Sequence, residues 1–100
     1  MTVQLEQQSP GAWRISGVLN FASVPDLSER GGALFDGQSE VQIDLSQVQH
    51  ADSAGVALLV EWMGEARRRA VNIRYLNVPA QMLAIVRVTS LDRILPLARA

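Results

Sequence analysis

The residues from Val41 to Arg69, VQIDLSQVQHADSAGVALLVEWMGEARRR, contain the transition from a strand to a helix on which the rest of the fold depends. Apolar and polar residues alternate over Val41–Leu45, which predicts a strand, whereas the apolar run that begins at Val56 has the length and spacing of a helix. Between the two, Asp52 or Ser53 offers a side-chain oxygen to the free backbone N–H groups of a first helical turn. The sequence therefore predicts that a helix begins at Asp52-Ser53.

This central helix has a core side and an outward side. The core side carries Val56, Leu59, Met63 and Ala66, and the outward side carries Glu61, Glu65, Arg68 and Arg69. Near its start the outward side is expected to carry three uncharged residues, Ala54, Ala57 and Leu58. Either a neighbouring helix of this chain covers these residues, or they form a docking surface for a partner around Ser53.

Ser53 is also a candidate phosphorylation site. Its hydroxyl is expected at the positive end of the helix dipole, close to backbone amides that have no helical acceptor. A phosphate group at this position would be favoured electrostatically.

Composition limits the classes of function. One hundred residues with 48% hydrophobic content fit one compact domain over residues 1–100. A net charge of −1 and the absence of lysine give no basic stripe for nucleic acid. The chain has no cysteine for disulfides or thiolate zinc sites and no apparent export segment, so we expect a cytoplasmic protein. Its longest apolar run, 56–60, is too short to cross a bilayer, so any membrane association would go through a partner.

The flanking segments predict the remaining elements. Alternating residues at 3–7 and 12–19 predict a hairpin, and a helix is expected to start near Ser23, with Leu27, Ala33 and Leu34 on its inner side. Gly31-Gly32 should shorten or bend this helix. A further strand is expected at 71–76 and a helix at 80–88. The pattern of the tail 89–100 is ambiguous, and one interpretation is a short edge strand at Ile94-Leu95 that ends before Pro96.

These elements predict an α/β domain with a mixed sheet of four to five strands and three or more helices packed mainly on one face. The crossover from the strand at Val41 to the strand that ends at Leu76 should make those two strands parallel neighbours.

Catalytic and metal chemistry are not expected. Ser53, His50 and Asp52 lie too close along the chain to satisfy both hydrogen bonds of a catalytic triad. His50 is the only histidine and is expected in the loop before the central helix, and Asp44 is expected to bond local backbone groups at the end of its strand. Without a glycine-rich phosphate loop, nucleotide binding is not expected either, and we predict no cofactor.

The run Ile43-Asp44-Leu45-Ser46, then Val48, then Asp52 to Leu59 resembles the signature of STAS domains, the family of bacterial anti-sigma-factor antagonists and sulfate-transporter tails. The order of the expected elements agrees with that family over nearly the whole chain. In the family's antagonists, a kinase phosphorylates the Ser or Thr at the position of Ser53, and the modified protein loses its partner. The resemblance thus implies, as one alternative, an anti-sigma factor antagonist that is switched by phosphorylation of Ser53.

The run Gly55-Val56-Ala57-Leu58-Leu59 is similar to the MlaB-type STAS subunits of the lipid-asymmetry, or toluene-tolerance, ABC transporter. Subunits of that group bind the ATPase subunit at the inner membrane and support its assembly and activity. The resemblance therefore implies a non-catalytic cytoplasmic subunit of a phospholipid transporter, held at the inner membrane only through its partner. The partner-binding residues that it implies are Asp52, Ser53, Ala54, Ala57 and Leu58 on the central helix, and Leu27, Ser28 and Arg30 on the preceding helix.

Overall fold

Five strands form one mixed sheet in the order β1-β2-β3-β4-β5. The computed structural model describes residues 3–98. Its strands are β1 (Val3–Ser9), β2 (Ala12–Leu19), β3 (Glu40–Ala51), β4 (Asn72–Leu76) and β5 (Leu97–Ala98). The β1–β2 hairpin is antiparallel and the other pairs are parallel, so the predicted mixed sheet and the parallel β3–β4 crossover are confirmed.

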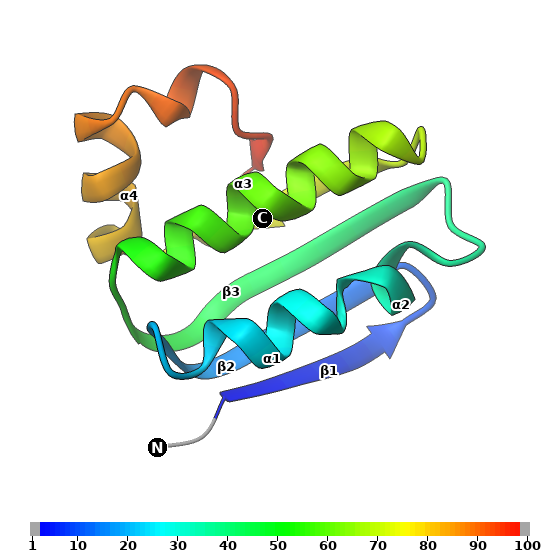
Figure 1. Ribbon diagram of the computed structural model, residues 1–100, viewed down its shortest axis with the longest axis horizontal. Helices are drawn as coiled ribbons and strands as arrows, with labels where there is room; N and C mark the ends of the chain where they lie inside the picture. Colours follow the sequence, from blue (N-terminus) through cyan, green and yellow to red (C-terminus); the bar gives the residue numbers. More distant parts are fainter. Residues whose placement is uncertain (1–2, 99–100) are drawn as a thin grey trace.

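The helices lie together on one face of this sheet (Figure 1). They are α1 (Val24–Glu29), α2 (Gly31–Phe35), α3 (Ser53–Arg68), α4 (Ala80–Val88) and the short 3₁₀ helix η1 (Leu91–Arg93). The predicted break at Gly31-Gly32 is confirmed, since α1 ends at Glu29 and α2 starts at Gly31. Leu27 and Leu34 are buried as expected, whereas Ala33 is exposed.

The two faces of the sheet differ in character. The strand register places Ile43 beside Tyr75 on the face beneath the helices, and both are fully buried. The hydroxyl of Tyr75 donates a hydrogen bond to the carbonyl oxygen of Leu59 and so ties β4 to the middle of α3. On the open face, Arg14 lies beside Asp44. The core therefore lies between the sheet and its single layer of helices.

The end of α3 is closed by backbone hydrogen bonds. The N–H of Val71 donates to the carbonyl of Ala66 at 2.8 Å, and the N–H of Ala70 donates to that of Arg67 at 3.2 Å. Ala70 has a φ of 57°. These features form the Schellman arrangement, which supplies N–H donors to carbonyl groups that have no donor left within the helix. It turns the chain back toward β4.

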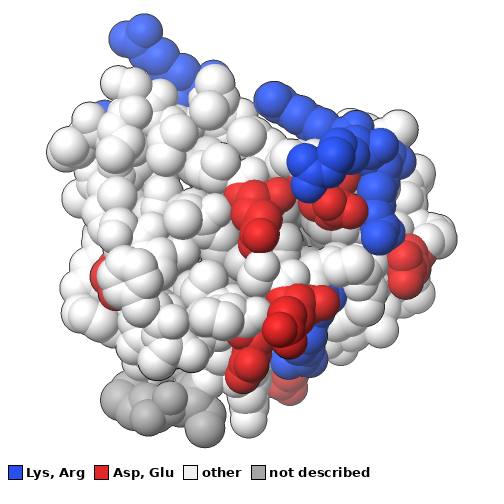
Figure 2. Space-filling model, viewed as in Figure 1, with Lys and Arg blue, Asp and Glu red and all other residues white. Residues whose placement is uncertain are grey.

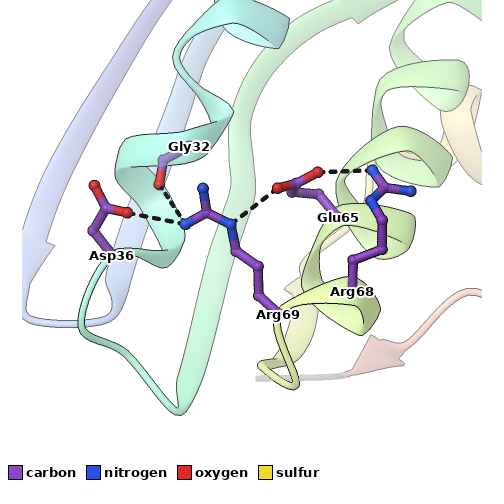
Figure 3. A network of polar contacts seen from close by, with 5 residues as sticks. All are labelled: Gly32, Asp36, Glu65, Arg68 and Arg69. Atoms are coloured by element: carbon purple, nitrogen blue, oxygen red, sulfur yellow. Dashed lines mark hydrogen bonds and ion pairs between the residues drawn. The ribbon is translucent and has the colours of Figure 1, made fainter.

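A polar network joins this end of α3 to α2 (Figure 3). Nη1 of Arg69 donates to the carbonyl of Gly32 at 3.2 Å and to Oδ1 of Asp36 at 2.9 Å, while its Nε donates to Oε2 of Glu65 at 2.9 Å. Arg68 bonds the other oxygen of Glu65 at 2.7 Å. Hydrogen bonds from Arg68 and Arg69 lower the pKa of Glu65, and those to Asp36 and Glu65 raise the pKa of Arg69.

Two local expectations are wrong. β3 continues to Ala51, so His50 lies within a strand and not in a loop. The edge strand of the tail is Leu97–Ala98, after Pro96, and not Ile94-Leu95. Proline suits this place because only its carbonyl is used there, accepting a hydrogen bond from the N–H of Tyr75 at 3.0 Å. Residues 99 and 100 of the tail lie outside the described residues.

Candidate partner-binding surface

The start of α3 holds Ser53 at the surface on a fixed backbone. Oδ1 of Asp52 accepts a hydrogen bond from the N–H of Ala54 at 2.8 Å, which confirms Asp52 as the helix cap. The N–H of Asp52 in turn donates to the carbonyl of Leu19 at 3.1 Å. Gly55 packs so closely that a Cβ there would lie 3.1 Å from Cβ of Leu19. Ser53 itself is exposed.

Ser53 is not bonded to groups that would activate its hydroxyl. Among residues 3–98, no hydrogen bond joins the Ser53 side chain to His50 or Asp52, and His50 is exposed on β3. The same range holds no group of three or more His, Asp or Glu residues placed to bind a metal ion. What the geometry offers is an exposed hydroxyl at a helix start.

The expected outward position of Ala54 and Leu58 is wrong. Ala54 is 7% exposed and Leu58 is 1% exposed. These residues share an i, i+4 row with Trp62. Leu58 lines a groove together with Val24 and Pro25 of α1, and Trp62 lies against Gly31 of α2. The alternative that this chain itself covers these residues is therefore correct for Ala54 and Leu58.

The outward row of α3 is Ser53, Ala57 and Glu61, all of which are exposed. Ala57 thus remains at the surface beside Ser53, as expected from the sequence. The outward row is uncharged over its first turns and becomes charged only at Glu61. Figure 2 shows this gradient across the helical face, where the area over α4 and the first half of α3 is mostly uncharged.

The three residues of the preceding helix that the family resemblance implies as partner contacts lie in three different environments. Leu27 has no exposed surface and belongs to the core, so it cannot contact a partner without unfolding. Ser28 is half-buried, and its Oγ donates to Oε2 of Glu61 on α3 at 2.7 Å. Arg30 points to the sheet, where Nη2 donates to the carbonyl of Leu5 on the edge strand β1 at 3.3 Å. Only Ser28 lies beside the α3 surface.

Phe21 is a surface residue that the sequence reasoning missed. It is 78% exposed in the turn between β2 and α1. The turn is held by its own polar side chains: Oδ1 of Asn20 accepts from the N–H groups of Ala22 and Ser23 at 2.9 and 3.0 Å. Oγ of Ser23 donates to the carbonyl of Val18 at 2.7 Å. Phe21 is therefore an exposed aromatic side chain on a well-braced turn.

A shallow groove of about 340 Å³ separates α1 from α3. Its lining is mostly apolar, with a polar end formed by the bonded pair Ser28 and Glu61. The lining residues are Val24, Pro25, Ser28, Ala57, Leu58 and Glu61. We call the groove together with Phe21 and Ser53 the α1–α3 surface.

A larger groove, of about 520 Å³, lies between α4, η1 and the ends of β4 and β5. It is lined by Asn77, Val78, Leu83, Arg87, Asp92, Leu97 and Ala98. None of these residues was a predicted site residue, and none belongs to the α1–α3 surface. The two grooves are separate features of the helical side.

Asp44 bonds a local backbone group, as expected from the sequence, but it lies within β3 and not at the end of the strand. Its Oδ1 accepts hydrogen bonds from the N–H of Ser46 at 2.9 Å and from Nδ2 of Asn77 at 3.1 Å, and Arg14 Nε lies 3.6 Å from its Oδ2. Partial burial works against ionisation, but these hydrogen bonds and the charge of Arg14 outweigh it and lower the pKa of Asp44. The carboxylate therefore stabilises the open face of the sheet.

No helix within residues 3–98 has both the length and the apolar character required to span a bilayer. The comparison with curated proteins gives no match. Solved structures with the same fold include the anti-sigma factor antagonist SpoIIAA in its unphosphorylated form, at 20% identity and a TM-score of 0.77, covering 99% of this chain and 88% of that one.

Two further structures show the same fold. The Bacillus cell fate determinant SpoIIAA in its phosphorylated form is 22% identical with a TM-score of 0.73, covering 99% of this chain and 91% of the other. An anti-sigma factor antagonist from Mycobacterium paratuberculosis is 24% identical with a TM-score of 0.75, covering 96% and 83%. The family model described as "Mlab, STAS domain" matches residues 2–96. The chain therefore belongs to the MlaB-type STAS domain family.

Proposed function

We propose that this protein is a non-catalytic STAS subunit that binds and supports the ATPase of a phospholipid-transporting ABC transporter, which maintains outer-membrane lipid asymmetry. It would act in the cytoplasm, peripheral to the inner membrane through that partner. The observation that carries the proposal is that Phe21, Ser53 and Ala57 are exposed and uncharged in a chain of the MlaB-type family. Phe21 follows β2, and Ser53 follows the neighbouring parallel strand β3, so both lie at the same edge of the sheet. Exposed apolar and aromatic side chains of this kind are typical of the centre of a protein interface.

The second candidate function is an anti-sigma factor antagonist that a kinase switches at Ser53. The exposure of Ser53 at the start of α3 favours this alternative, because a kinase needs an accessible hydroxyl. A phosphate there would introduce a charge of about −2 into an apolar contact and would weaken it by desolvation. Both functions use the same surface, and they differ in the identity of the partner and in whether Ser53 is modified.

The test compares Ser53→Ala with Ser53→Glu in cells that express the full chain, followed by isolation of membranes. If the transporter proposal is correct, the wild type and Ser53→Ala should copurify with an ATPase and a permease from the membrane fraction, and Ser53→Glu should not. Ser39→Glu is the matched control, because it adds the same charge at an exposed turn before β3.

Recovery of a soluble kinase without transporter subunits would reject the transporter proposal in favour of the antagonist. Mass spectrometry of Ser53 gives an independent readout. A phosphorylated fraction that rises when the partner is released would support the switch, and an unmodified Ser53 under all growth conditions would count against it.

A further inference from the structure

We infer that the α1–α3 groove binds a helical segment of the partner protein in which apolar residues are followed at one end by Arg or Lys, and that Glu61 contacts this cation. The inference rests on the proposed function, because it specifies the partner segment that this surface accepts. It adds the requirement that the partner segment carry a positive charge, which follows neither from the family match nor from Ser53.

The first argument is the shape and lining of the groove. Val24 and Pro25 form the wall on α1, Ala57 forms the wall on α3, and Leu58 closes the floor. Both walls come from helices that run side by side on the helical face of the sheet (Figure 1). An apolar channel between two helices matches the way in which amphipathic helices insert apolar side chains into grooves.

The second argument is charge. Glu61 is exposed at the polar end of the groove, and it forms no ion pair within residues 3–98. The ion pairs of the helical face lie farther along, where Arg68 and Arg69 meet Glu65. Acidic side chains lie over the middle of α3 and along α1 in Figure 2, where one basic group lies among them, and most of the other basic groups lie toward the end of α3. A cation from a partner would complement this region.

The third argument is the position of the Glu61 carboxylate. The hydrogen bond from Ser28 uses Oε2 of Glu61 and holds the carboxylate over the polar end of the groove. Its other oxygen, Oε1, accepts no hydrogen bond among the described residues. An ionised carboxylate has acceptor sites on both oxygens, so an incoming guanidinium or ammonium group can bind Oε1 without displacing Ser28.

The same charge disfavours other ligands. Nucleic acid and anionic lipid headgroups carry negative charge and would be repelled by Glu61. Phe21 lies on the turn that leads into α1 and is not part of the groove lining. A protein segment can contact both Phe21 and the groove.

The experiment places a photo-crosslinking amino acid at position 57, in place of the exposed Ala57, in the full chain within cells. The crosslinked partner peptide is then sequenced. We expect a segment with apolar residues at helical spacing and an Arg or Lys at one end. A crosslinker in place of Gln42, on the open face of the sheet, should capture no such segment.

Charge exchange then tests the contact itself. Glu61→Gln keeps the acceptor for Ser28 and should lower the amount of copurified partner by about threefold, as expected for one exposed ion pair. Glu61→Arg should lower it by about tenfold, and changing the partner's basic residue to Glu should restore it. Glu40→Arg makes the same change at the start of β3 and should have no effect.

The inference is overturned if position 57 yields no crosslink while copurification persists, if the captured segment is acidic, or if Glu61→Arg leaves the partner bound. Each of these results leaves the proposed function standing when the partner is still a transporter ATPase. Conversely, a basic apolar segment from a soluble kinase would retain the inference and reject the transporter.

Discussion

Gly31 is a residue at which a side chain has no room. A Cβ built there would lie 2.7 Å from Nε1 of Trp62, whose ring is 1% exposed and closely packed. At Gly32 the nearest atom is Nη2 of Arg69, at 3.5 Å, which is an ordinary contact. Neither glycine has a positive φ, so the difference between the two positions is one of space.

Gly31→Ala should therefore lower the free energy of unfolding by about 1–3 kcal/mol, as is typical of overpacked cores. Gly32→Ala should leave it unchanged or raise it by up to about 1 kcal/mol, because alanine restricts the unfolded chain. Urea denaturation of both variants measures the difference. Equal losses at the two positions would contradict the role assigned to Trp62.

At the scale of elements, the hydrogen bond from Tyr75 to Leu59 joins β4 to α3. Tyr75→Phe should lower the free energy of unfolding at neutral pH by about 0.5–1.5 kcal/mol. Burial raises the pKa of Tyr75, whereas the phenol of the unfolded chain keeps a pKa of about 10. Above that pH the unfolded state loses a proton that the folded state retains, so the contribution of Tyr75 to stability falls as pH rises.

The alkaline fall in stability should consequently be smaller in Tyr75→Phe than in the wild type. Tyr75 is the only tyrosine, so phenolate absorbance follows this group alone. In the wild type the absorbance should appear together with unfolding. A phenolate signal from the folded protein near the ordinary tyrosine pKa would show that the hydroxyl is accessible.

The junction of α2 with α3 depends on Arg69, which bonds both helices (Figure 3). Arg69→Gln should speed amide hydrogen exchange in α2, because the bonds to Gly32 and Asp36 are lost. Arg68→Gln is the matched control, since Arg68 bonds only Glu65 on its own helix. Similar exchange rates in α2 for the two variants would mean that the network does not hold α2 in place.

For the whole molecule, the one-sided arrangement assigns partner contact to the helices and leaves the other face of the sheet open. Phe21→Ser on the helical side should reduce copurification of the partner about tenfold, as expected for an aromatic anchor. Arg74→Glu, at an exposed position of β4 beside Gln42, should have no effect. Because both residues are exposed, neither change should alter the unfolding midpoint appreciably. Loss of binding in Arg74→Glu alone would place the partner on the open face.

The features that could be predicted from the sequence depend on local signals. The cap at Asp52 marks the start of α3, alternation marks β1 and β4, and the spacing of apolar residues gives the bounds of α4. The tail gave no such signal, because β5 has only two residues and depends on backbone bonds to β4. The class of fold followed from the order of these elements.

The surface was predicted less completely, because it depends on which element lies beside which. Periodicity places Ala54 and Leu58 on one side of α3, but only the packing of neighbouring elements, α1 in the case of Leu58, decides that this side is buried. Phe21 has no local signal that separates it from a core phenylalanine such as Phe35. The hydrogen bonds of Asn20 and Ser23 fix the turn in which Phe21 is exposed, and they can be identified only from the three-dimensional structure.

The anchoring of α3 to Leu19, through the Asp52 amide and the close approach of Gly55, limits what a modification of Ser53 can do. The backbone that carries the Ser53 hydroxyl is held in place by these contacts, so an added phosphate would change the charge of the surface and not the fold. Amide resonances of Ser53→Glu should move only within the opening turn of the helix. A partner protein would therefore detect a modification of this serine directly on binding, and no slow conformational change of this chain would have to come first.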